Sequence, residues 1–159
     1  MMMIAASLAG IGFGNAGVHL AHGMSYPVSG MVRDYMPDGY EIDHPLVPHG
    51  MSVVLNAPAV FRFTAPANPR RHLEAAQALG ADVTGAGPDD AGTILADRII
   101  EFMRDVDIPN GLGAVGFTSD DIPALVEGTM PQQRITKLAA RPNDEKDLAN
   151  LFEDAMTYW

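Results

Sequence analysis

The chain has 159 residues, of which 47% are apolar and 19% charged, and this balance is typical of one globular domain with a substantial core. The net charge of −10 argues against nucleic-acid binding, which needs a basic surface to meet phosphates. There is no cysteine, which excludes disulfides and thiolate metal sites, and no apolar run reaches the roughly 18 residues of a membrane helix.

The first part of the chain predicts two helices separated by a loop. Residues 1–22 are rich in Ala, Met and Leu and are expected to form one helix, whose glycines let another helix or a ligand approach closely. Pro27 and Gly30 close this region, and residues 33–48, with three prolines, predict an irregular loop. A second helix is expected over residues 51–63, with Pro58 as a kink or boundary.

Two further helices are expected in the middle of the chain. A short one over residues 70–79 would end at Gly80. The clearest helix of the chain begins at Asp89 or Asp90 as N-cap. Its apolar stripe has helical spacing and consists of Ile94, Leu95, Ile99, Phe102, Met103 and Val106.

Two more helices complete the chain and give the fold class. Thr118 or Ser119 caps a short helix that runs through Glu127. Asn143 is expected to cap the last helix, whose apolar face comprises Leu148, Leu151, Phe152, Ala155, Met156 and Trp159. Period-two alternation is nearly absent, so the sequence predicts an all-α domain.

Histidines are concentrated near the N-terminus, and four of the five lie between residues 12 and 50. Neutral imidazole suits divalent iron and zinc, so this region predicts a metal centre of nitrogen and carboxylate ligands. His22 and His49 each precede a glycine, which allows close approach at a rigid backbone position. The spacing leaves open whether they bind the same ion, and two histidines alone do not complete such a site.

The remaining histidines have structural interpretations. His19 lies three residues before His22 and would share its helix face, but we favour a histidine there that forms hydrogen bonds within the fold or to a metal ligand and does not bind the metal itself. His44 would line a cleft, and His72 is expected on a solvent-facing surface. An arginine near a metal-bound alcohol could hold a substrate carboxylate through a bidentate pair, although a solvated surface position is favoured for each of Arg33, Arg62, Arg70 and Arg71.

The segment Gly12-x-Gly14-x-x-Gly17 matches the dinucleotide fingerprint. In that fingerprint the glycines follow a β-strand and open a long helix that receives the pyrophosphate. Here helix-forming residues precede the glycines, and Pro27 leaves little room for the helix that should follow. We interpret the match as coincidental.

Two segments resemble a known family. His22-Gly23-Met24-Ser25-Tyr26-Pro27 and the later Asp43-His44-Pro45-Leu46-Val47-Pro48-His49-Gly50 are similar to the metal-binding signature of the iron-containing (group III) alcohol dehydrogenases. Within that family, the residues of these two segments are most similar to those of the hydroxyacid–oxoacid transhydrogenase branch. The segments Asp121-Ile122-Pro123-Ala124-Leu125-Val126 and Arg141-Pro142-Asn143 resemble the C-terminal end of the same family, so the likeness runs through essentially the whole chain.

The resemblance implies a fold and a ligand set. Family members join an N-terminal nucleotide-binding domain, which holds NAD, to an all-helical domain of the dehydroquinate-synthase-like type. An aspartate and three histidines bind Fe²⁺ (or Zn²⁺), and His22 and His49 match the last two ligands. Residues 1–159 are then a single helical domain, with the ligand region at 12–50, the C-terminal helices at 51–159, and the nucleotide-binding domain absent.

The resemblance also bears on the reaction. Many members have a proton-relaying histidine four residues after the first of these two ligands, where this chain has Tyr26, a phenol that we expect to act as a substitute proton donor. The implied activity is metal-dependent oxidoreduction of an alcohol or hydroxyacid with NAD, of the 4-hydroxybutyrate/2-oxoglutarate transhydrogenase type. It would take place in the cytoplasm of a bacterium or in the mitochondrial matrix of a eukaryote.

Two alternatives stand beside this hypothesis. In the first alternative, the chain is a folded, non-catalytic remnant. In the second, it is one half of a split enzyme that needs a complementing N-terminal half. In each case the apolar faces of helices 1–22 and 51–63 should lack their usual partners, so we expect self-association into a homo-oligomer. The expected small-molecule partner is a hydroxyacid, an oxoacid or an alcohol, with no nucleic acid and no membrane.

Overall fold

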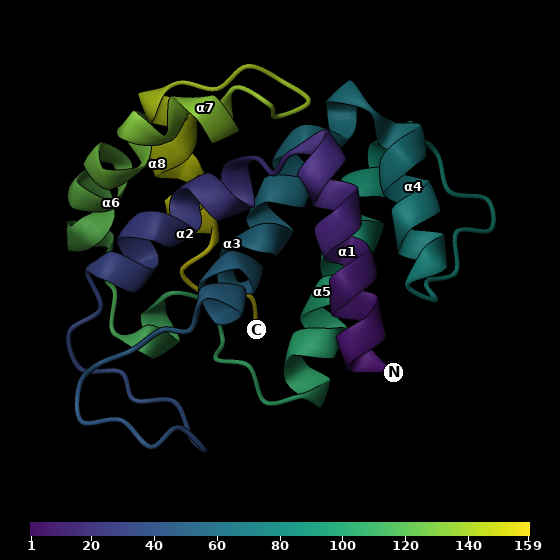
Figure 1. Cartoon of the computed structure of the whole chain (residues 1–159). Helices are drawn as coiled ribbons and strands as arrows, with labels where there is room; N and C mark the ends of the chain where they lie inside the picture. Colours follow the sequence, from purple (N-terminus) through teal and green to yellow (C-terminus); the bar gives the residue numbers. More distant parts are fainter.

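The computed structural model describes residues 1–159 and consists of helices joined by turns and loops, without a β-strand (Figure 1). The all-α prediction is therefore confirmed. The helices are α1 (Met2–Ala16), α2 (Leu20–Gly30), α3 (His49–Thr64), α4 (Pro69–Ala78), α5 (Ala91–Asp105), α6 (Ile122–Thr129), α7 (Gln133–Thr136) and α8 (Glu145–Asp154).

Helix α3 forms the centre of the fold and packs against α2, α5 and α8 (Figure 1). Its Leu55, Ala59 and Val60 are almost completely buried, as is Phe152 of α8. Pro58 lies inside the helix and does not end it. The large apolar side chains of α3 are buried or only partly exposed, with Met51, Val53 and Val54 among the partly exposed ones, so exposure of an apolar face by this helix stays a prediction.

The prediction of a single helix over residues 1–22 is also wrong. The chain leaves α1 at Gly17 and re-enters a helix at Leu20, with a bend of 112° between α1 and α2. Gly17 has φ +76°, a left-handed conformation that favours glycine. A Cβ at this residue would lie 2.6 Å from Cδ1 of Leu138, so both the backbone and the packing require glycine. Pro27, expected to close the region, lies inside α2.

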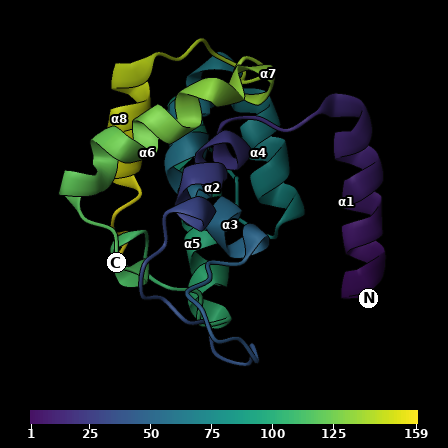
Figure 2. The same ribbon diagram turned by 60° about the vertical axis from the view of Figure 1, so that its left-hand side comes forward.

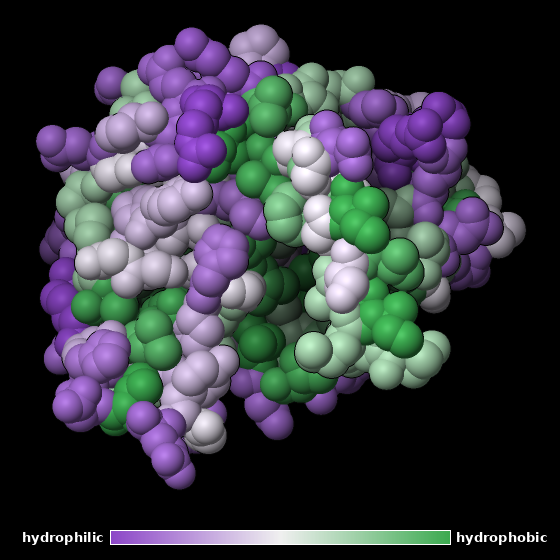
Figure 3. All heavy atoms as spheres, viewed as in Figure 1, coloured by the Kyte–Doolittle hydropathy of each residue, from purple (hydrophilic) through white to green (hydrophobic).

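Helix α1 stands apart from the other helices (Figure 2) and has no buried residue. Its large apolar side chains are well exposed, for example Leu8 at 63% and Ile11 at 65%. Figure 3 shows apolar surface over α1 and around a hollow beside it. No single helix of the chain is long and apolar enough to cross a membrane, and α1 with α2 reaches that length only as a sharply bent pair.

The remaining helices begin close to their predicted positions. Asp90 is the N-cap of α5, and the capping box of Thr118 with Asp121 opens a 3₁₀ turn that leads into α6. Helix α8 begins one residue later than predicted, because the carboxylate of Asp144, not the amide of Asn143, accepts the Asp147 N–H.

The apolar faces of α5 and α8 follow their predicted stripes only in part. In α5 the buried residues include Leu95 and Met103, whereas Phe102, with the Arg98 guanidinium over its ring, and Val106 are exposed. In α8 the predicted face is buried as far as Ala155, and Trp159 is 42% exposed.

Candidate metal centre

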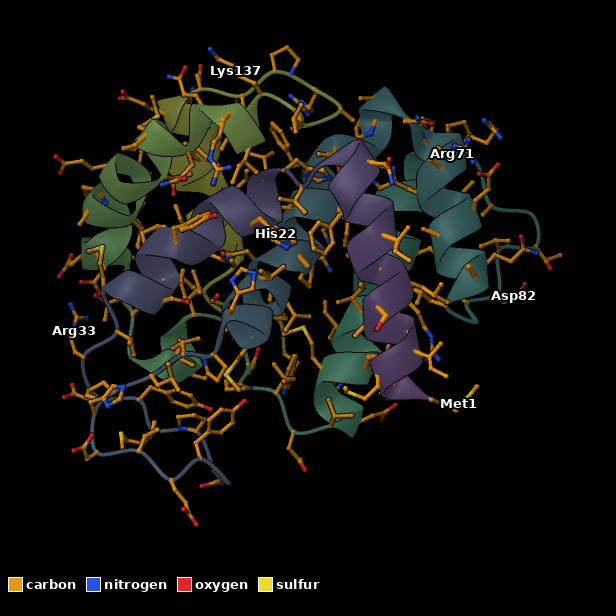
Figure 4. All side chains as sticks on the ribbon, viewed as in Figure 1. Met1, His22, Arg33, Arg71, Asp82 and Lys137 are labelled. Atoms are coloured by element: carbon orange, nitrogen blue, oxygen red, sulfur yellow. The ribbon has the colours of Figure 1, made fainter.

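His22 lies in the first turn of α2, close to where that helix crosses α3 (Figure 4). In this turn the single backbone carbonyl of His19 accepts the N–H groups of both His22 and Gly23. The hydroxyl of the buried Ser25 donates to the His22 carbonyl over 2.7 Å. The backbone that carries the imidazole of His22 is thereby held within the packed part of the chain.

His49 begins α3 in a similar way. Pro48 precedes it in an extended conformation, and the Pro48 carbonyl accepts the Ser52 N–H in the first turn of the helix. The hydroxyl of the buried Ser52 donates to the His49 carbonyl over 2.8 Å. The sequence His-Gly-Met-Ser thus occurs at the start of α2 and again at the start of α3, with the same serine hydrogen bond each time.

The fold brings these two histidines together although they lie far apart in the sequence. The ring centroids of His22 and His49 are 5.5 Å apart, and the rings are inclined by 60°. Burial, followed by the proximity of His49 and His19, lowers the pKa of His22 below its ordinary value. The neutral form of this imidazole, which is the form that binds metals, is therefore favoured.

The separation fits two ligands of one ion. Imidazole nitrogens at about 2.1 Å from a tetrahedral ion place their ring centroids roughly 5 Å apart. No group of three or more His, Cys, Asp or Glu side chains of this chain is arranged to hold a metal. The residues present thus fit part of a coordination sphere, with His22 and His49 as its candidate members.

Of the other histidines, His19 and His44 lie outside the pair. His19 precedes α2, and its Nδ1 atom is buried without a hydrogen-bond partner. Burial and, to a smaller extent, the proximity of His72 lower the pKa of His19. His44 is exposed in the loop before α3, and its Nδ1 lies 3.1 Å from a carboxylate oxygen of Asp43.

The expectation that His72 lies on a solvent face is wrong. This residue of α4 is only 9% exposed and packs edge-on against Phe61. Its Nδ1 lies 2.9 Å from the Asn68 carbonyl, and its Nε2 lies 2.9 Å from the Thr64 hydroxyl. Because a carbonyl oxygen only accepts, Nδ1 must carry a proton. The neighbouring Arg70 and Arg71 are exposed. Their charge led to the prediction of a solvent face, and nothing in the local sequence indicated that His72 alone is buried.

Tyr26 follows His22 by one helical turn, so the two side chains project from the same side of α2. The Tyr26 ring is 44% exposed, and its hydroxyl has no hydrogen-bond partner within the chain. The position leaves the phenol accessible near the histidine pair, and its role as a proton donor stays a prediction.

The four arginines that were considered as carboxylate binders all pair with acidic side chains of this chain. Arg33 forms a bidentate pair with Asp121, with N···O distances of 2.8 and 2.9 Å. Arg62 pairs with Asp97, and Arg70 and Arg71 both pair with Glu74. Each of the four guanidinium groups is therefore already paired, and this arrangement does not favour any of them as the binding group of a substrate carboxylate.

The all-helical fold of this chain has counterparts in a known family of enzymes. The family model described as "Fe-containing alcohol dehydrogenase family, C-terminal" matches residues 1–156. The chain therefore belongs to the Fe-containing alcohol dehydrogenase family. Within it, the chain is 61% identical over 155 residues to the mitochondrial hydroxyacid-oxoacid transhydrogenase of Pongo abelii and 60% identical to that of Homo sapiens.

Two solved structures support the same fold. Superposition on 1,3-propanediol oxidoreductase gives a TM-score of 0.78 at 26% identity and covers 93% of this chain and 35% of the other. The alcohol dehydrogenase from Oenococcus oeni gives 0.79 at 24% identity, with the same coverage. The match to each of the two transhydrogenases covers 98% of this chain and 33% of the relative, so the chain spans about a third of their length.

Proposed function

We propose that this chain is the metal-binding helical portion of an oxidoreductase that acts on a hydroxyacid or alcohol, of the hydroxyacid–oxoacid transhydrogenase type. The observation that carries the proposal is the convergence of His22 and His49 at the starts of α2 and α3, with ring centroids 5.5 Å apart. High identity to transhydrogenases over 98% of the chain supports the class of reaction. NAD is the proposed redox cofactor.

His22 and His49 would hold a divalent ion, with Fe²⁺ or Zn²⁺ as candidates. When bound, such an ion supplies Lewis-acid polarisation of a substrate oxygen. The protein's own part is orientation. Ser25 and Ser52 hold the two histidine carbonyls, and the lowered pKa of His22 favours the ligating form of its ring at neutral pH.

Tyr26 is the proposed proton donor of this site. It projects from the same side of α2 as His22, and its exposed hydroxyl is free of partners within the chain. A phenol can donate a proton to an oxygen that gains negative charge during the reaction. The matched test is Tyr26→Phe, which removes only the hydroxyl and leaves the ring.

The residues of this chain do not fit a complete NAD site. Gly12 and Gly14 lie inside α1 with no strand before them, and the helix that follows, α2, has only 11 residues with a proline inside it. We therefore infer that NAD is bound mainly by a separate nucleotide-binding domain, and that helices upstream of this chain bring the other two ligands together with that domain. That domain belongs either to a longer form of this protein or to a complementing chain, and α1 is its proposed contact surface. In a eukaryote, the mitochondrial names of the relatives favour the matrix.

A non-catalytic role is the second candidate. It is favoured by one specific observation: the chain by itself assembles only two potential metal ligands. Two nitrogen ligands without a third bind divalent ions weakly, so a remnant of this kind would keep the packed helices and lose the metal.

Metal titration distinguishes the two candidates. Anaerobic calorimetry with Fe²⁺ and with Zn²⁺ should give weak one-site binding to the wild-type chain and none to the His22→Ala/His49→Ala variant. His44→Ala is the control, because His44 is an exposed histidine that contacts only Asp43, and it should bind as the wild type does. Equal binding by all three proteins would exclude the histidine pair as a site and favour the non-catalytic role.

A further inference from the structure

A second candidate site lies on elements that do not carry the histidine pair. It is a pocket of about 440 Å³ between the end of α6, α7, the loop over residues 137–143 and the first turns of α8. Its volume falls in the range of small-molecule sites. None of its lining residues belongs to α2 or α3, so this pocket is distinct from the proposed metal centre.

The polar lining of the pocket is rich in hydrogen-bond donors. Lys137 and Arg141 contribute positive charge, and Gln133 and Asn143 contribute amide groups. No Asp or Glu lines the pocket, although residues 76–159 carry fifteen acidic side chains against six basic ones. A local concentration of positive charge in the acidic part of the chain favours an anionic ligand.

Several of these donors are free within the chain. The side-chain ammonium of Lys137 forms no ion pair or hydrogen bond within the chain, whereas its backbone N–H donates to the Gln133 carbonyl, and Figure 4 shows the residue at the outer edge of the molecule, pointing away from His22. Arg141 stacks on the Phe63 ring at 4.0 Å and donates one N–H to the Phe63 carbonyl, which holds its guanidinium in place and leaves other N–H groups available. The pocket therefore combines one oriented cation with one mobile cation.

Thr136 adds a hydroxyl that is directed by packing. Its methyl group faces α2, because Cγ2 is the nearest atom to the position that a Cβ on Gly23 would take. Its hydroxyl forms no hydrogen bond within the chain, and the residue lines the pocket although it is only 6% exposed overall. The Thr136 hydroxyl is not among the buried polar atoms that lack a partner, so it reaches the solvent of the pocket and is available to a ligand oxygen.

We propose that this pocket binds a small oxyanion, a carboxylate or a phosphate group, through Lys137, Arg141 and the Thr136 hydroxyl. The two anion classes share the same chemistry of several oxygen acceptors around a negative charge. The apolar side chains of Met130 and Leu148, which also line the pocket, would contact the carbon part of an organic acid. Inorganic phosphate has no carbon part and would not make this apolar contact.

The test is calorimetric titration of the full chain with inorganic phosphate and, separately, with succinate at constant ionic strength. The proposal expects saturable one-site binding of at least one anion, and tighter binding of succinate would identify the organic source. Lys137→Gln should weaken binding at least fivefold. Thr136→Val, which keeps the shape of the side chain, should weaken it severalfold.

The control is Lys146→Gln, because Lys146 is an exposed cation on the first turn of α8 that does not line the pocket. Circular dichroism establishes that each variant is folded. Equal loss in the Lys137 and Lys146 variants would indicate nonspecific attraction and overturn the proposal, as would no binding of either anion. Because metal ligation does not enter this experiment, its outcome is independent of the histidine pair.

Discussion

The repeated His-Gly-Met-Ser sequence offers an internally controlled mutation. A Cβ on Gly23 would lie 2.7 Å from Cγ2 of Thr136, with Cγ2 of Thr129 at 3.9 Å. Both threonines are buried, and their β-branched side chains have few alternative rotamers. A Cβ on Gly50, the corresponding residue of α3, would have no atom within 4 Å. The same substitution thus meets two different environments.

The magnitudes follow from these distances. Overpacking a close contact costs about 1–3 kcal/mol, and replacing a helical glycine by alanine returns up to about 1 kcal/mol. Gly23→Ala should therefore lower the free energy of unfolding by about 1–2 kcal/mol. Gly50→Ala should leave it unchanged or raise it by up to about 1 kcal/mol. The measurement is urea unfolding followed by circular dichroism, at one protein concentration for all variants.

A double-mutant cycle tests the stated cause. Thr136→Ser removes Cγ2, the atom that the new methyl group would strike. If the contact is responsible, Gly23→Ala should cost at least about 1 kcal/mol less in the Thr136→Ser background. The reasoning is refuted if Gly23→Ala is as stable as Gly50→Ala, or if its cost is the same in both backgrounds.

Three further predictions concern other parts of the chain. Light scattering after size exclusion should show that the wild-type chain self-associates through α1. Leu8→Glu should reduce the self-association, because Leu8 is an exposed apolar residue of that helix. A monomeric wild-type chain would contradict this prediction. Hydrogen bonds from Arg33 hold the pKa of Asp121 below its ordinary value, so the pair's stabilisation is present above about pH 4 and is lost as the pH falls further. Asp121→Asn should lower the free energy of unfolding by about 1 kcal/mol at neutral pH and should make it depend less on pH below about pH 4. An unchanged pH dependence of the free energy of unfolding in this variant would argue against the pair. Gly111→Ala should lower the stability of the fold by more than about 2 kcal/mol, measured by thermal unfolding. The reasons are that φ is +73° at Gly111 and that the new Cβ would lie 2.6 Å from the Ala155 carbonyl oxygen. A variant as stable as the wild type would show that the C-terminal segment moves freely.

Local signals in the sequence located most helices but not their interruptions. Asp90 and Thr118 cap helices as predicted, because capping depends on a few neighbouring residues. The break after α1 was missed, because Ala, Met and Leu favour a continuous helix and Gly17 alone is a weak stop signal. The contact between Gly17 and Leu138, which joins distant parts of the chain, is visible only in the folded structure.

The candidate site shows the same division. Residue types identified His22 and His49 as ligand candidates, while their spacing in the sequence could not show whether they meet. The fold brings their rings to 5.5 Å by crossing α2 over α3. It also buried His72, which sequence context had placed on the surface, because Thr64 and the Asn68 carbonyl satisfy its ring nitrogens.

The sequence by itself determined the all-helical class, most helix starts and the family resemblance, since these depend on local periodicity, capping residues and short motifs. Only the tertiary structure decided which histidines converge, that α1 lies apart from the core, and that Lys137 and Arg141 share a pocket. The physical reason is that convergence depends on how helices cross and on which side chains allow close approach, and those contacts join residues far apart in the chain.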